Sequence, residues 1–419
     1  MELIKIEGGR ALRGTVKIDS AKNSTVALIP AAILADSPVV LEGIPNIVDV
    51  ERLGEMIEQL GGSYGYEGDD FIIDPTNLQN VPLVDGPVTK LRASYYFMGA
   101  LLAKFNEVVI GMPGGCYLGP RPIELHLKGF EALGAKIEQQ GGTVHLKADK
   151  LVGAKIYLDF PSVGATINIM IAATKAEGVT VIENAAKEPE IVDLSNLLNS
   201  MGANIRGAGT DEIRISGVDG LTGTRHQIIP DRIEAGTYIT LAAVAGEEIK
   251  IENIIPHHLE ALISKLREMG ADIDVQTDHV VVRGRKILNA VDFKTSIYPG
   301  LATDLQQPLV TLLTQSNGMG MVEDTIYSDR FKNCYELNKM GANIKVQGNS
   351  AIIQGVSELR GARVMATDLR AGASLVIAAL VAEGVTEIGN TYHIDRGYAN
   401  IEEKLTNIGA KIWRQNIEE

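Results

Sequence analysis

A short glycine phrase recurs six times along this chain at nearly constant spacing. Each phrase joins an apolar residue, a glycine and a second small residue, at Leu60-Gly61-Gly62, Leu133-Gly134-Ala135, Met201-Gly202-Ala203, Met269-Gly270-Ala271, Met340-Gly341-Ala342 and Ile408-Gly409-Ala410. Successive first glycines stand 73, 68, 68, 71 and 68 residues apart. A fixed period of this size indicates one structural unit of about 70 residues that is used six times.

Each repeat begins with an apolar, alanine-rich segment followed by a short β-branched segment. The alanine-rich segments predict helices buried on all sides, over Ser24–Ala35, Ser94–Ala103, Ala165–Ala176, Gly236–Ala245, Gln307–Thr314 and Ala371–Ala382. The segments that follow predict strands, over Pro38–Glu42, Glu107–Gly111, Val179–Glu183, Glu248–Glu252, Gly320–Asp324 and Val385–Gly389.

An amphipathic helix then ends at each glycine phrase, where glycine can adopt the left-handed capping conformation. Alternating segments such as Asn204–Arg206 with Glu212–Ser216, and Asp272–Val275 with His279–Arg283, predict a hairpin after each cap. With a strand before the alanine-rich helix, as at Glu2–Glu7 in the first unit, every unit reads β-α-β-α-β-β. Since a helix buried on all sides needs a cover, we expect the sheets outside and the alanine-rich helices inside.

Six units divide most simply into two domains of three, with the switch near 227–231. The opening strand over Glu2–Glu7 is expected to pair in the C-terminal domain, because the last unit ends near Trp413 without a following strand. A continuous solenoid is the alternative, but solenoid repeats usually have about 20 to 45 residues.

Composition excludes several classes of protein. With 419 residues, 45% of them apolar, the chain is long enough for more than one core. The start lacks a signal-peptide pattern, and the longest apolar stretch, Val26–Ala35, contains Pro30 and is too short to span a membrane. A soluble, cytoplasmic protein is expected. A net charge of −14 argues against a nucleic-acid or membrane partner, although a few arginines can still dominate one anion site.

The second unit departs most from the shared pattern. After its strand it carries Gly111-Met112-Pro113-Gly114-Gly115-Cys116-Tyr117-Leu118-Gly119-Pro120-Arg121-Pro122, a loop rich in glycine and proline around one thiol. Cys116 is a candidate functional residue, either as an acid or, when a cation favours the thiolate, as a nucleophile. The second cysteine, Cys334, lies on an amphipathic helix and is expected to be a buried structural residue.

The starts of the alanine-rich helices are the second departure. Cations or small hydroxyl residues occupy the first turn in Lys22-Asn23-Ser24, Leu91-Arg92-Ala93-Ser94, Ser162-Val163-Gly164-Ala165 and Leu369-Arg370-Ala371-Gly372. Helix N-termini present free amides and a partial positive charge, which suit phosphate or carboxylate groups. A solvated surface position is the usual alternative for any single arginine, but the recurrence favours anion binding.

Asp304 is the acidic residue that stands out, because it lies where other units begin their buried helices. It is either a helix cap or a general base. Walker, Ser-His-Asp and paired-carboxylate glycosidase patterns are not apparent, so ATP chemistry and hydrolysis gain no support.

Several phrases, in order over essentially the whole chain, resemble the UDP-N-acetylglucosamine 1-carboxyvinyltransferases, the enolpyruvyl transferases that open bacterial peptidoglycan synthesis. These phrases are Lys22-Asn23, Gly114-Gly115-Cys116 with Arg121-Pro122, Glu183-Asn184-Ala185-Ala186 through Glu188-Pro189-Glu190-Ile191-Val192-Asp193, Pro230-Asp231-Arg232-Ile233-Glu234-Ala235-Gly236, Thr303-Asp304 and His393-Ile394-Asp395-Arg396-Gly397-Tyr398.

The resemblance implies an α/β fold of two inside-out barrels with three repeats each, one of residues 22–229 and one of residues 1–21 and 230–419. It implies that phosphoenolpyruvate and UDP-N-acetylglucosamine bind in the cleft between them, with no metal or other cofactor. Lys22, Arg121 and Arg396 would hold the phosphate of phosphoenolpyruvate, and Arg330 and Arg370 would lie near its carboxylate. The implied contacts to the UDP-sugar are Asn23, Arg92, Arg121, Pro122, Ile123, Glu124, Leu125, Ser162, Val163, Gly164, Asp304 and Ile326.

The resemblance also implies a mechanism. Asp304 would deprotonate the sugar 3-hydroxyl as it attacks C2 of phosphoenolpyruvate, and Cys116 would protonate C3, giving a tetrahedral intermediate that loses phosphate. Cys116 would also be the residue that fosfomycin alkylates. Phe160 stands where many members of the family carry lysine. The rivals are the sister enzyme that uses shikimate 3-phosphate and a non-catalytic paralogue that only binds a nucleotide-sugar.

Overall fold

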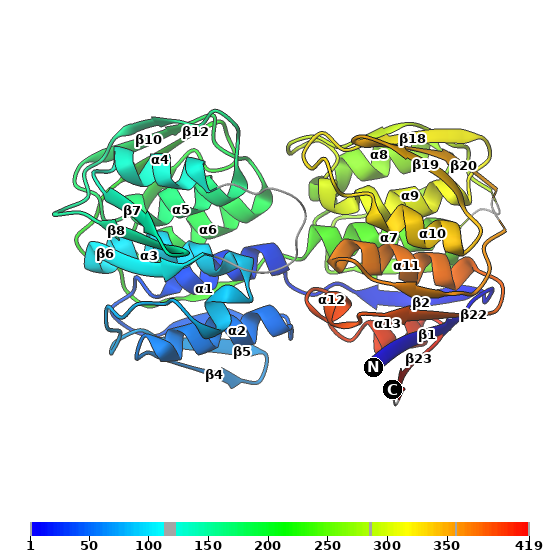
Figure 1. Ribbon diagram of the computed structural model, residues 1–419, viewed down its shortest axis with the longest axis horizontal. Helices are drawn as coiled ribbons and strands as arrows, with labels where there is room; N and C mark the ends of the chain where they lie inside the picture. Colours follow the sequence, from blue (N-terminus) through cyan, green and yellow to red (C-terminus); the bar gives the residue numbers. More distant parts are fainter. Residues whose placement is uncertain (1, 113–122, 285–286, 357, 418–419) are drawn as a thin grey trace. The chain divides into compact units, whose positions relative to one another are not determined.

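The polypeptide forms two compact units, each described by itself. A computed structural model describes residues 2–112, 123–284, 287–356 and 358–417 (Figure 1). The first unit comprises the described residues between Ser20 and Ile229. The second unit combines the N-terminal segment up to Asp19 with the described residues from Pro230 onward.

The first unit contains three small mixed sheets, with strand orders β13-β3-β5-β4, β6-β8-β7 and β9-β10-β12-β11. In the first and last of these sheets an edge strand, β13 or β9, runs parallel to its neighbour, and an antiparallel hairpin completes the sheet. In the sheet of β6, β7 and β8 a single parallel bridge between Leu83 and Ile110 stands in place of the parallel edge strand. The strands are β3 (Val39–Glu42), β4 (Ser63–Glu67), β5 (Asp70–Asp74), β6 (Glu107–Gly111), β7 (Lys136–Gln140), β8 (Thr143–Lys147), β9 (Lys155–Tyr157), β10 (Val179–Glu183), β11 (Asn204–Arg206), β12 (Glu212–Ser216) and β13 (Arg225–Gln227).

The second unit repeats this design in sheets ordered β2-β14-β16-β15, β17-β18-β20-β19 and β21-β22-β1-β23. The N-terminal strand β1 lies antiparallel between β22 and β23, so it completes the sheet of the last repeat as its sequence position predicted. The strands are β1 (Glu2–Glu7), β2 (Leu12–Lys17), β14 (Gly246–Glu252), β15 (Asp272–Val275), β16 (His279–Arg283), β17 (Phe293–Lys294), β18 (Met319–Glu323), β19 (Asn343–Gln347), β20 (Ser350–Gln354), β21 (Arg363–Met365), β22 (Val385–Gly389) and β23 (Lys411–Asn416).

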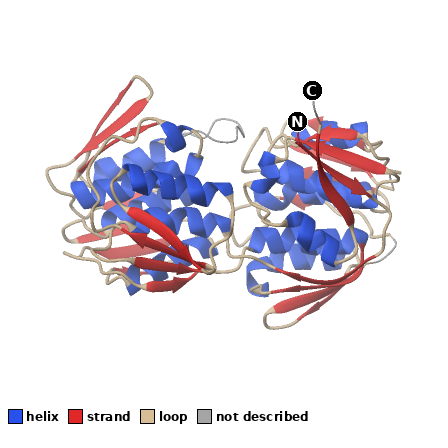
Figure 2. Ribbon diagram, turned by 90° about the horizontal axis from the view of Figure 1, so that it is seen from below, coloured by secondary structure: helices blue, strands red, loops and turns tan. Residues whose placement is uncertain are grey.

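The alanine-rich helices fill the interior of each unit, and the prediction that they are buried is confirmed. In each unit these helices contact one another and the strands lie around them (Figure 2). Small residues allow the close approach: a Cβ on Gly99 would lie 2.6 Å from the carbonyl oxygen of Asn168. The inner helices are α1 (Lys22–Ala32), α3 (Tyr96–Phe105) and α5 (Val163–Ala173) in the first unit, and α7 (Arg232–Ala245), α9 (Gln306–Thr314) and α11 (Leu369–Val381) in the second.

Several inner helices start earlier than their apolar pattern suggested. The helices α5, α7 and α11 begin two to four residues before the alanine-rich segment, because Ser162, Asp231 and Asp368 cap their first amides. By contrast, α3 begins later, at Tyr96, after the 3-10 turn η2 (Arg92–Tyr95). The polar residues singled out in the sequence therefore lie on first turns or capping positions, which matters for the candidate site.

The glycine phrase closes an outer amphipathic helix in every repeat. All six first glycines have left-handed φ values between 88° and 111°. Each helix ends in a Schellman motif; for example, the amide of Gly62 donates to the Ile57 carbonyl and that of Gly61 to the Glu58 carbonyl. The predicted left-handed caps are therefore confirmed. The helices are α2 (Val48–Gln59), α4 (Glu124–Ala132), α6 (Pro189–Ser200), α8 (Glu260–Glu268), α10 (Lys332–Lys339) and α13 (Ile401–Asn407).

Short helical turns complete the described structure: η1 (Gly86–Thr89), η3 (Pro256–Leu259), η4 (Thr303–Leu305) and α12 (Tyr392–Asp395). Within the part of the chain that the structure describes, no helix has both the length and the apolar character needed to cross a bilayer.

Candidate functional site

The first turn of α1 carries two of the predicted site residues, Lys22 and Asn23. The ammonium of Lys22 lies 2.9 Å from a carboxylate oxygen of Asp49, which is fully buried in the first turn of α2. The next residue after Asn23, Ser24, donates a hydrogen bond to Oδ2 of the buried Asp193 of α6. The other carboxylate oxygen of Asp193 lies 2.7 Å from Nε2 of His226. Buried carboxylates thus hold the start of α1 from two sides and fix where Lys22 can reach.

A second group gathers where α5 begins. Ser162 caps the helix by accepting a hydrogen bond from the amide of Ala165 at 3.2 Å. Gly164 follows in close contact with two side chains, since a Cβ there would lie 2.9 Å from Cε1 of His126 and 3.0 Å from the hydroxyl of Tyr95, so a larger residue would displace them. The guanidinium of Arg92 lies 5.6 Å from the centre of the Tyr95 ring. The structure therefore brings Arg92, Ser162, Val163 and Gly164 into one neighbourhood.

His126, from α4, is the centre of this neighbourhood and was not predicted from the sequence. Its ring packs edge-on against Tyr95, and its Nδ1 lies 2.9 Å from the side-chain amide nitrogen of Asn168. Burial and then the charge of Arg92 lower the pKa of His126 from 6.5 to about 3. His126 is therefore neutral, and since Nδ1 accepts from the Asn168 amide, its proton is assigned to Nε2.

The buried, neutral His126 gives the fold a specific pH dependence. The unfolded chain binds a proton at this histidine below about pH 6.5, whereas the folded chain does so only near pH 3. The contribution of neutral His126 to the free energy of unfolding is therefore fully present above about pH 6.5 and is lost as the pH falls. At pH 5 the loss is about 2 kcal/mol. Urea unfolding at pH 8 and pH 5 should show a smaller pH difference for His126→Gln than for wild type.

His257→Gln is the matched control, because that histidine is exposed and pairs with Glu260 on the surface. We expect it to keep the wild-type pH difference. An equal difference in wild type and His126→Gln would contradict the assignment of His126 as a buried neutral group.

In the second unit, Asp304 lies in η4 between two buried arginines. Its carboxylate oxygens are 2.7 Å from Arg330 and 3.2 Å from Arg370, and both arginine side chains are 3% exposed. Neither η4 nor α9 has a side-chain cap among the described residues, so the structure shows Asp304 held by guanidinium groups and does not show it as a helix cap.

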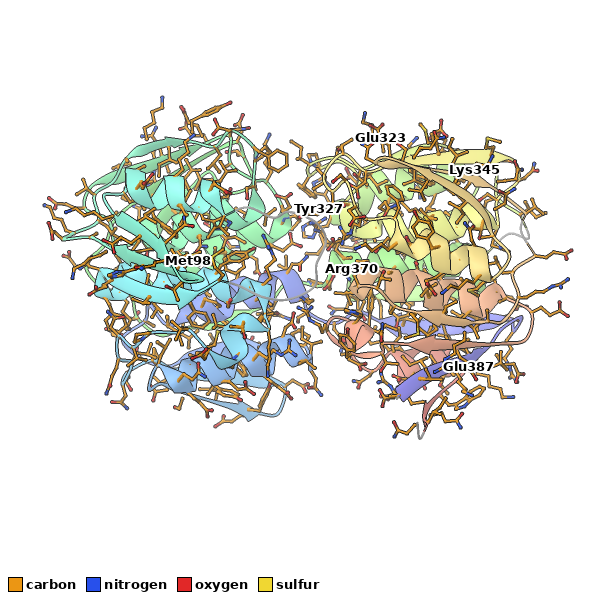
Figure 3. All side chains as sticks on the ribbon, viewed as in Figure 1. Met98, Glu323, Tyr327, Lys345, Arg370 and Glu387 are labelled. Carbon is orange, nitrogen blue, oxygen red and sulfur yellow. The ribbon has the colours of Figure 1, made fainter. Side chains whose placement is uncertain are left out.

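The two arginines are held by further contacts of their own. Burial opposes the charge on Arg330, but the carboxylates of Asp304 and Asp368 outweigh it and raise its pKa. Burial also opposes the charge on Arg370, but the interactions with Tyr398 and Asp304 outweigh this effect and raise the pKa of Arg370. Arg370, at the start of α11, and Tyr327 are labelled in Figure 3. The guanidinium carbon of Arg330 lies 5.4 Å from the centre of the Tyr327 ring. Both guanidinium groups are therefore permanently charged.

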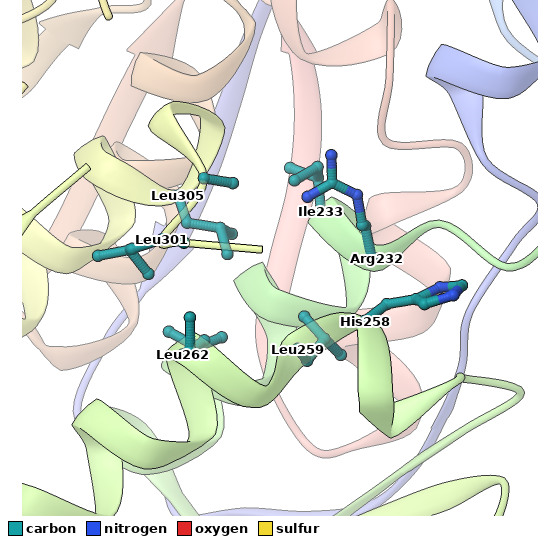
Figure 4. Close-up of a pocket in the computed structure, with 10 residues that line it drawn as sticks. Arg232, Ile233, His258, Leu259, Leu262, Leu301 and Leu305 are labelled. Atoms are coloured by element: carbon teal, nitrogen blue, oxygen red, sulfur yellow. The ribbon is translucent and has the colours of Figure 1, made fainter. Parts of the chain in front are cut away.

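A small pocket lies behind the turn that carries Asp304. Ala302 and Leu305 from this turn line it together with residues of α7, η3 and α8. Arg232 and His258 lie on one side and Leu301 and Leu305 on the other (Figure 4). Its mainly apolar walls do not suit a phosphate, so we assign the pocket to packing beneath η4.

Two further predicted residues lie near the ends of short elements. Arg396 follows α12 as its C-terminal cap, and the preceding Asp395 is bound by Arg414 of β23 at 3.0 Å. The backbone amide of Ile326 donates to the buried carboxylate of Asp324 at 2.9 Å. Ionic and hydrogen-bonded contacts thus fix both positions within the second unit.

Comparisons with known proteins decide the family. UDP-N-acetylglucosamine 1-carboxyvinyltransferase 2 from Geobacillus kaustophilus is 59% identical over 417 residues, which covers 100% of this chain and 97% of the relative. The protein of the same name from Bacillus subtilis is 57% identical over 418 residues, with the same coverage of both chains. The chain belongs to the UDP-N-acetylglucosamine 1-carboxyvinyltransferase family.

Broader comparisons place this family within one fold. Residues 6–405 match the family model described as EPSP synthase (3-phosphoshikimate 1-carboxyvinyltransferase). The enolpyruvyl transferase NikO from Streptomyces tendae is 28% identical, with a TM-score of 0.90 over 100% of this chain and 99% of its own. EPSP synthase from Acinetobacter baumannii is 19% identical, with a TM-score of 0.77 over 99% of this chain and 100% of its own, and this likeness shows the fold alone. The predicted enolpyruvyl transferase fold is thus confirmed as a mixed α/β fold with several small sheets.

Some predicted site residues of this carboxyvinyltransferase family member lie outside the described residues, namely Cys116, Arg121 and Pro122. Ile123, Glu124 and Leu125 are described at the start of α4, the helix that supplies His126. Phe160 is 45% exposed shortly before Ser162. Cys334 is buried as predicted, and burial raises the pKa of its thiol to about 12, so it remains an unreactive thiol at neutral pH.

Sequence reasoning missed the residues that support the predicted set. Asp49 pairs with Lys22, His126 abuts Gly164, and Asp324 binds the Ile326 amide. The only local signal was a polar residue inside an otherwise apolar pattern, which is common on surfaces as well. Their partners become visible only when the chain is folded.

Proposed function

We propose that this chain transfers the enolpyruvyl group of phosphoenolpyruvate to the 3-hydroxyl of UDP-N-acetylglucosamine and releases phosphate. The observation that carries this proposal is the identity of 57–59% over the full chain with relatives that bear the name of this activity. The reaction is the first committed step of peptidoglycan synthesis, and we place the protein in the cytoplasm on that basis.

The proposed binding roles follow the charges of the candidate residues. Lys22, Arg121 and Arg396 bind the phosphate of phosphoenolpyruvate, and Arg330 and Arg370 act near its carboxylate. Cationic side chains and helix N-termini are the groups that proteins use for such anions. The UDP-sugar contacts Asn23, Arg92, Arg121, Pro122, Ile123, Glu124, Leu125, Ser162, Val163, Gly164, Asp304 and Ile326 in this proposal.

The proposed reaction is an addition followed by an elimination. The sugar O3 forms a bond to C2 of phosphoenolpyruvate while its proton leaves to a base, and C3 gains a proton and becomes a methyl group. Phosphate then departs from C2 and C3 loses a proton, which restores the double bond. Fixed guanidinium and ammonium groups stabilise the negative charge that develops on the leaving phosphate. Every step uses protons and charges alone, so we propose that the enzyme needs neither a metal nor an organic cofactor.

We propose Asp304 as the base that receives the proton of the 3-hydroxyl. An ionised carboxylate only accepts hydrogen bonds, so it can accept one from a sugar hydroxyl and then take the proton. Arg330 and Arg370 contact Asp304 at 2.7 and 3.2 Å and fix its orientation. Its side chain is 24% exposed, whereas both arginines are 3% exposed, so the carboxylate is the accessible member of the cluster. This combination of access and fixed orientation supports a role in proton transfer.

We propose Cys116 as the acid that protonates C3, and as the nucleophile when it meets an electrophile such as fosfomycin. The thiolate opens the epoxide by forming a carbon–sulfur bond while the carbon–oxygen bond breaks, and the oxygen then takes up a proton. The chain has two cysteines, and the buried Cys334 thiol is unsuited to either role. A direct labelling experiment therefore identifies Cys116 by exclusion.

The finer architecture is part of the same proposal. We propose two inside-out α/β barrels, each with three β-α-β-α-β-β repeats. Support comes from the recurring order of a parallel edge strand followed by a hairpin, and from the inner position of the alanine-rich helices in each unit. The substrates named above are the only partners proposed, with no nucleic acid and no membrane insertion.

The acceptor specificity tests the proposed function. We expect phosphate release from phosphoenolpyruvate when UDP-N-acetylglucosamine is present, and background release with shikimate 3-phosphate. Release with shikimate 3-phosphate alone would favour the sister activity. No release with either acceptor, while UDP-N-acetylglucosamine still binds in calorimetry, would favour a non-catalytic paralogue.

A further inference from the structure

We propose that Asp324 and Thr303 are positioning residues that hold Arg330 against Asp304. The inference rests on the proposed function for its kinetic consequence, but its structural part stands on contacts within the second unit alone. Arg330 and Asp304 are 2.7 Å apart, and both belong to the proposed site.

Asp324 is a buried carboxylate at the centre of a dense hydrogen-bond network. It is 1% exposed and lies directly after β18. One oxygen, Oδ1, accepts from the hydroxyl of Thr295 at 2.9 Å and from the amides of Ile326 and Tyr327 at 2.9 and 3.0 Å. The other, Oδ2, accepts from the hydroxyl of Thr303 at 2.7 Å. Four donors therefore compensate the buried carboxylate and tie three segments together.

Thr303 relays this anchor to the Arg330–Asp304 pair. Its hydroxyl has a single proton, and a carboxylate only accepts, so that proton is directed to Asp324. The lone pairs of the same oxygen then face the guanidinium, and Nη1 of Arg330 donates to it at 2.9 Å. Because Nη2 of Arg330 contacts Asp304, two nitrogens of one planar group are fixed at once. The orientation of Arg330 over Asp304 is thus set by Asp324 through Thr303.

The same carboxylate also fixes a second proposed contact. The backbone amide of Ile326, a proposed contact of the UDP-sugar, donates a hydrogen bond to Asp324. Thr303, which donates to the same carboxylate, is the residue before Asp304. One buried group therefore sets the backbone at Ile326 and the side chain that faces Asp304. Precise placement matters here, since displacement of a reacting group by about 1 Å can lower a rate about 100-fold.

Thr303→Val tests the relay because valine keeps the shape of threonine and removes the hydroxyl. We expect a crystal structure of this variant to show Arg330 displaced from Asp304, and we expect kcat to fall about 10- to 100-fold with a smaller change in the Kd of UDP-N-acetylglucosamine. Thr303→Ser restores the hydroxyl and should restore both the contact and the rate.

Thr295→Val is the matched control. Thr295 is fully buried and Thr303 is partly buried, and both donate to the same carboxylate. No contact from Thr295 to Arg330 is found among the described residues. Both valine variants lose one hydroxyl from Asp324 and should lose similar thermal stability. Only Thr303→Val should lose the Arg330–Asp304 contact and the rate.

The outcomes separate this inference from the proposed function. An intact Arg330–Asp304 contact in Thr303→Val, or equal loss of rate in both valine variants, would overturn the positioning role. An inactive wild type would contradict the proposed function. Crystal structures of the wild type and of Thr303→Val would still decide whether Thr303 orients Arg330.

Discussion

Replacement of Asp304 by asparagine is expected to lower kcat by about 10²- to 10⁴-fold, the usual contribution of a general acid or base. Asparagine keeps the size of the side chain and one acceptor oxygen, but it cannot take the proton of the sugar hydroxyl. The Kd of UDP-N-acetylglucosamine should change far less, because the other proposed contacts to the nucleotide-sugar are unaltered. Steady-state turnover at saturating substrates and calorimetric binding provide the two measurements.

Asp304→Ala should show the same loss of turnover with an added loss of stability. Arg330 and Arg370 would then face each other without a shared carboxylate, and breaking a buried ion pair by removing one partner typically costs about 3–5 kcal/mol. Asp368→Asn is the control, because it also removes a buried carboxylate charge close to Arg330 but keeps the side-chain cap of α11 and leaves the proposed base in place. We expect it to lose stability without the loss of turnover seen in Asp304→Asn. Wild-type turnover in Asp304→Asn would remove the base role.

Replacement of Cys116 by aspartate is expected to preserve transfer but abolish fosfomycin sensitivity. Aspartic acid can still donate a proton to C3, whereas it cannot form the thioether that inactivates the enzyme. Residual activity after incubation with fosfomycin, together with the intact mass of the protein, measures both effects. The wild-type protein should gain one adduct and the variant none.

Cys334→Ala is the matched control for this experiment, since Cys334 is the other cysteine of the chain and is fully buried. It should keep both transfer activity and the fosfomycin adduct. An adduct on Cys116→Asp, or protection by Cys334→Ala, would show that Cys116 is not the residue attacked.

Features with a regular sequence period were predictable because local geometry determines them. The glycine phrase predicted left-handed caps, and Gly61 and Gly202 indeed close Schellman motifs. Alternation predicted the hairpin β15–β16 with both bounds correct. The helix starts were less accurate, since caps such as Asp231 extend a helix beyond its apolar residues. In such cases the polar capping residue determines where the helix begins, and hydrophobic periodicity does not reveal that position.

The candidate site was only partly predictable, because its supporting contacts join residues distant in sequence. Asp304 was noticed as an exception in its repeat, but its contact with Arg370 spans 66 positions. His126 looked like an ordinary polar residue of an amphipathic helix until its contact with Asn168, 42 positions away, was visible. Side-chain pairs of this kind depend on packing between repeats, which no local pattern encodes.

Acceptor comparison in deuterium oxide tests the central claim most directly. Addition followed by elimination makes C3 a methyl group, so the product formed with UDP-N-acetylglucosamine should carry deuterium in its vinyl methylene group. Mass spectrometry of the isolated product measures this. The account predicts a deuterated enolpyruvyl ether of UDP-N-acetylglucosamine and no product with shikimate 3-phosphate. A product with only protium at C3, or transfer to shikimate 3-phosphate alone, would contradict it.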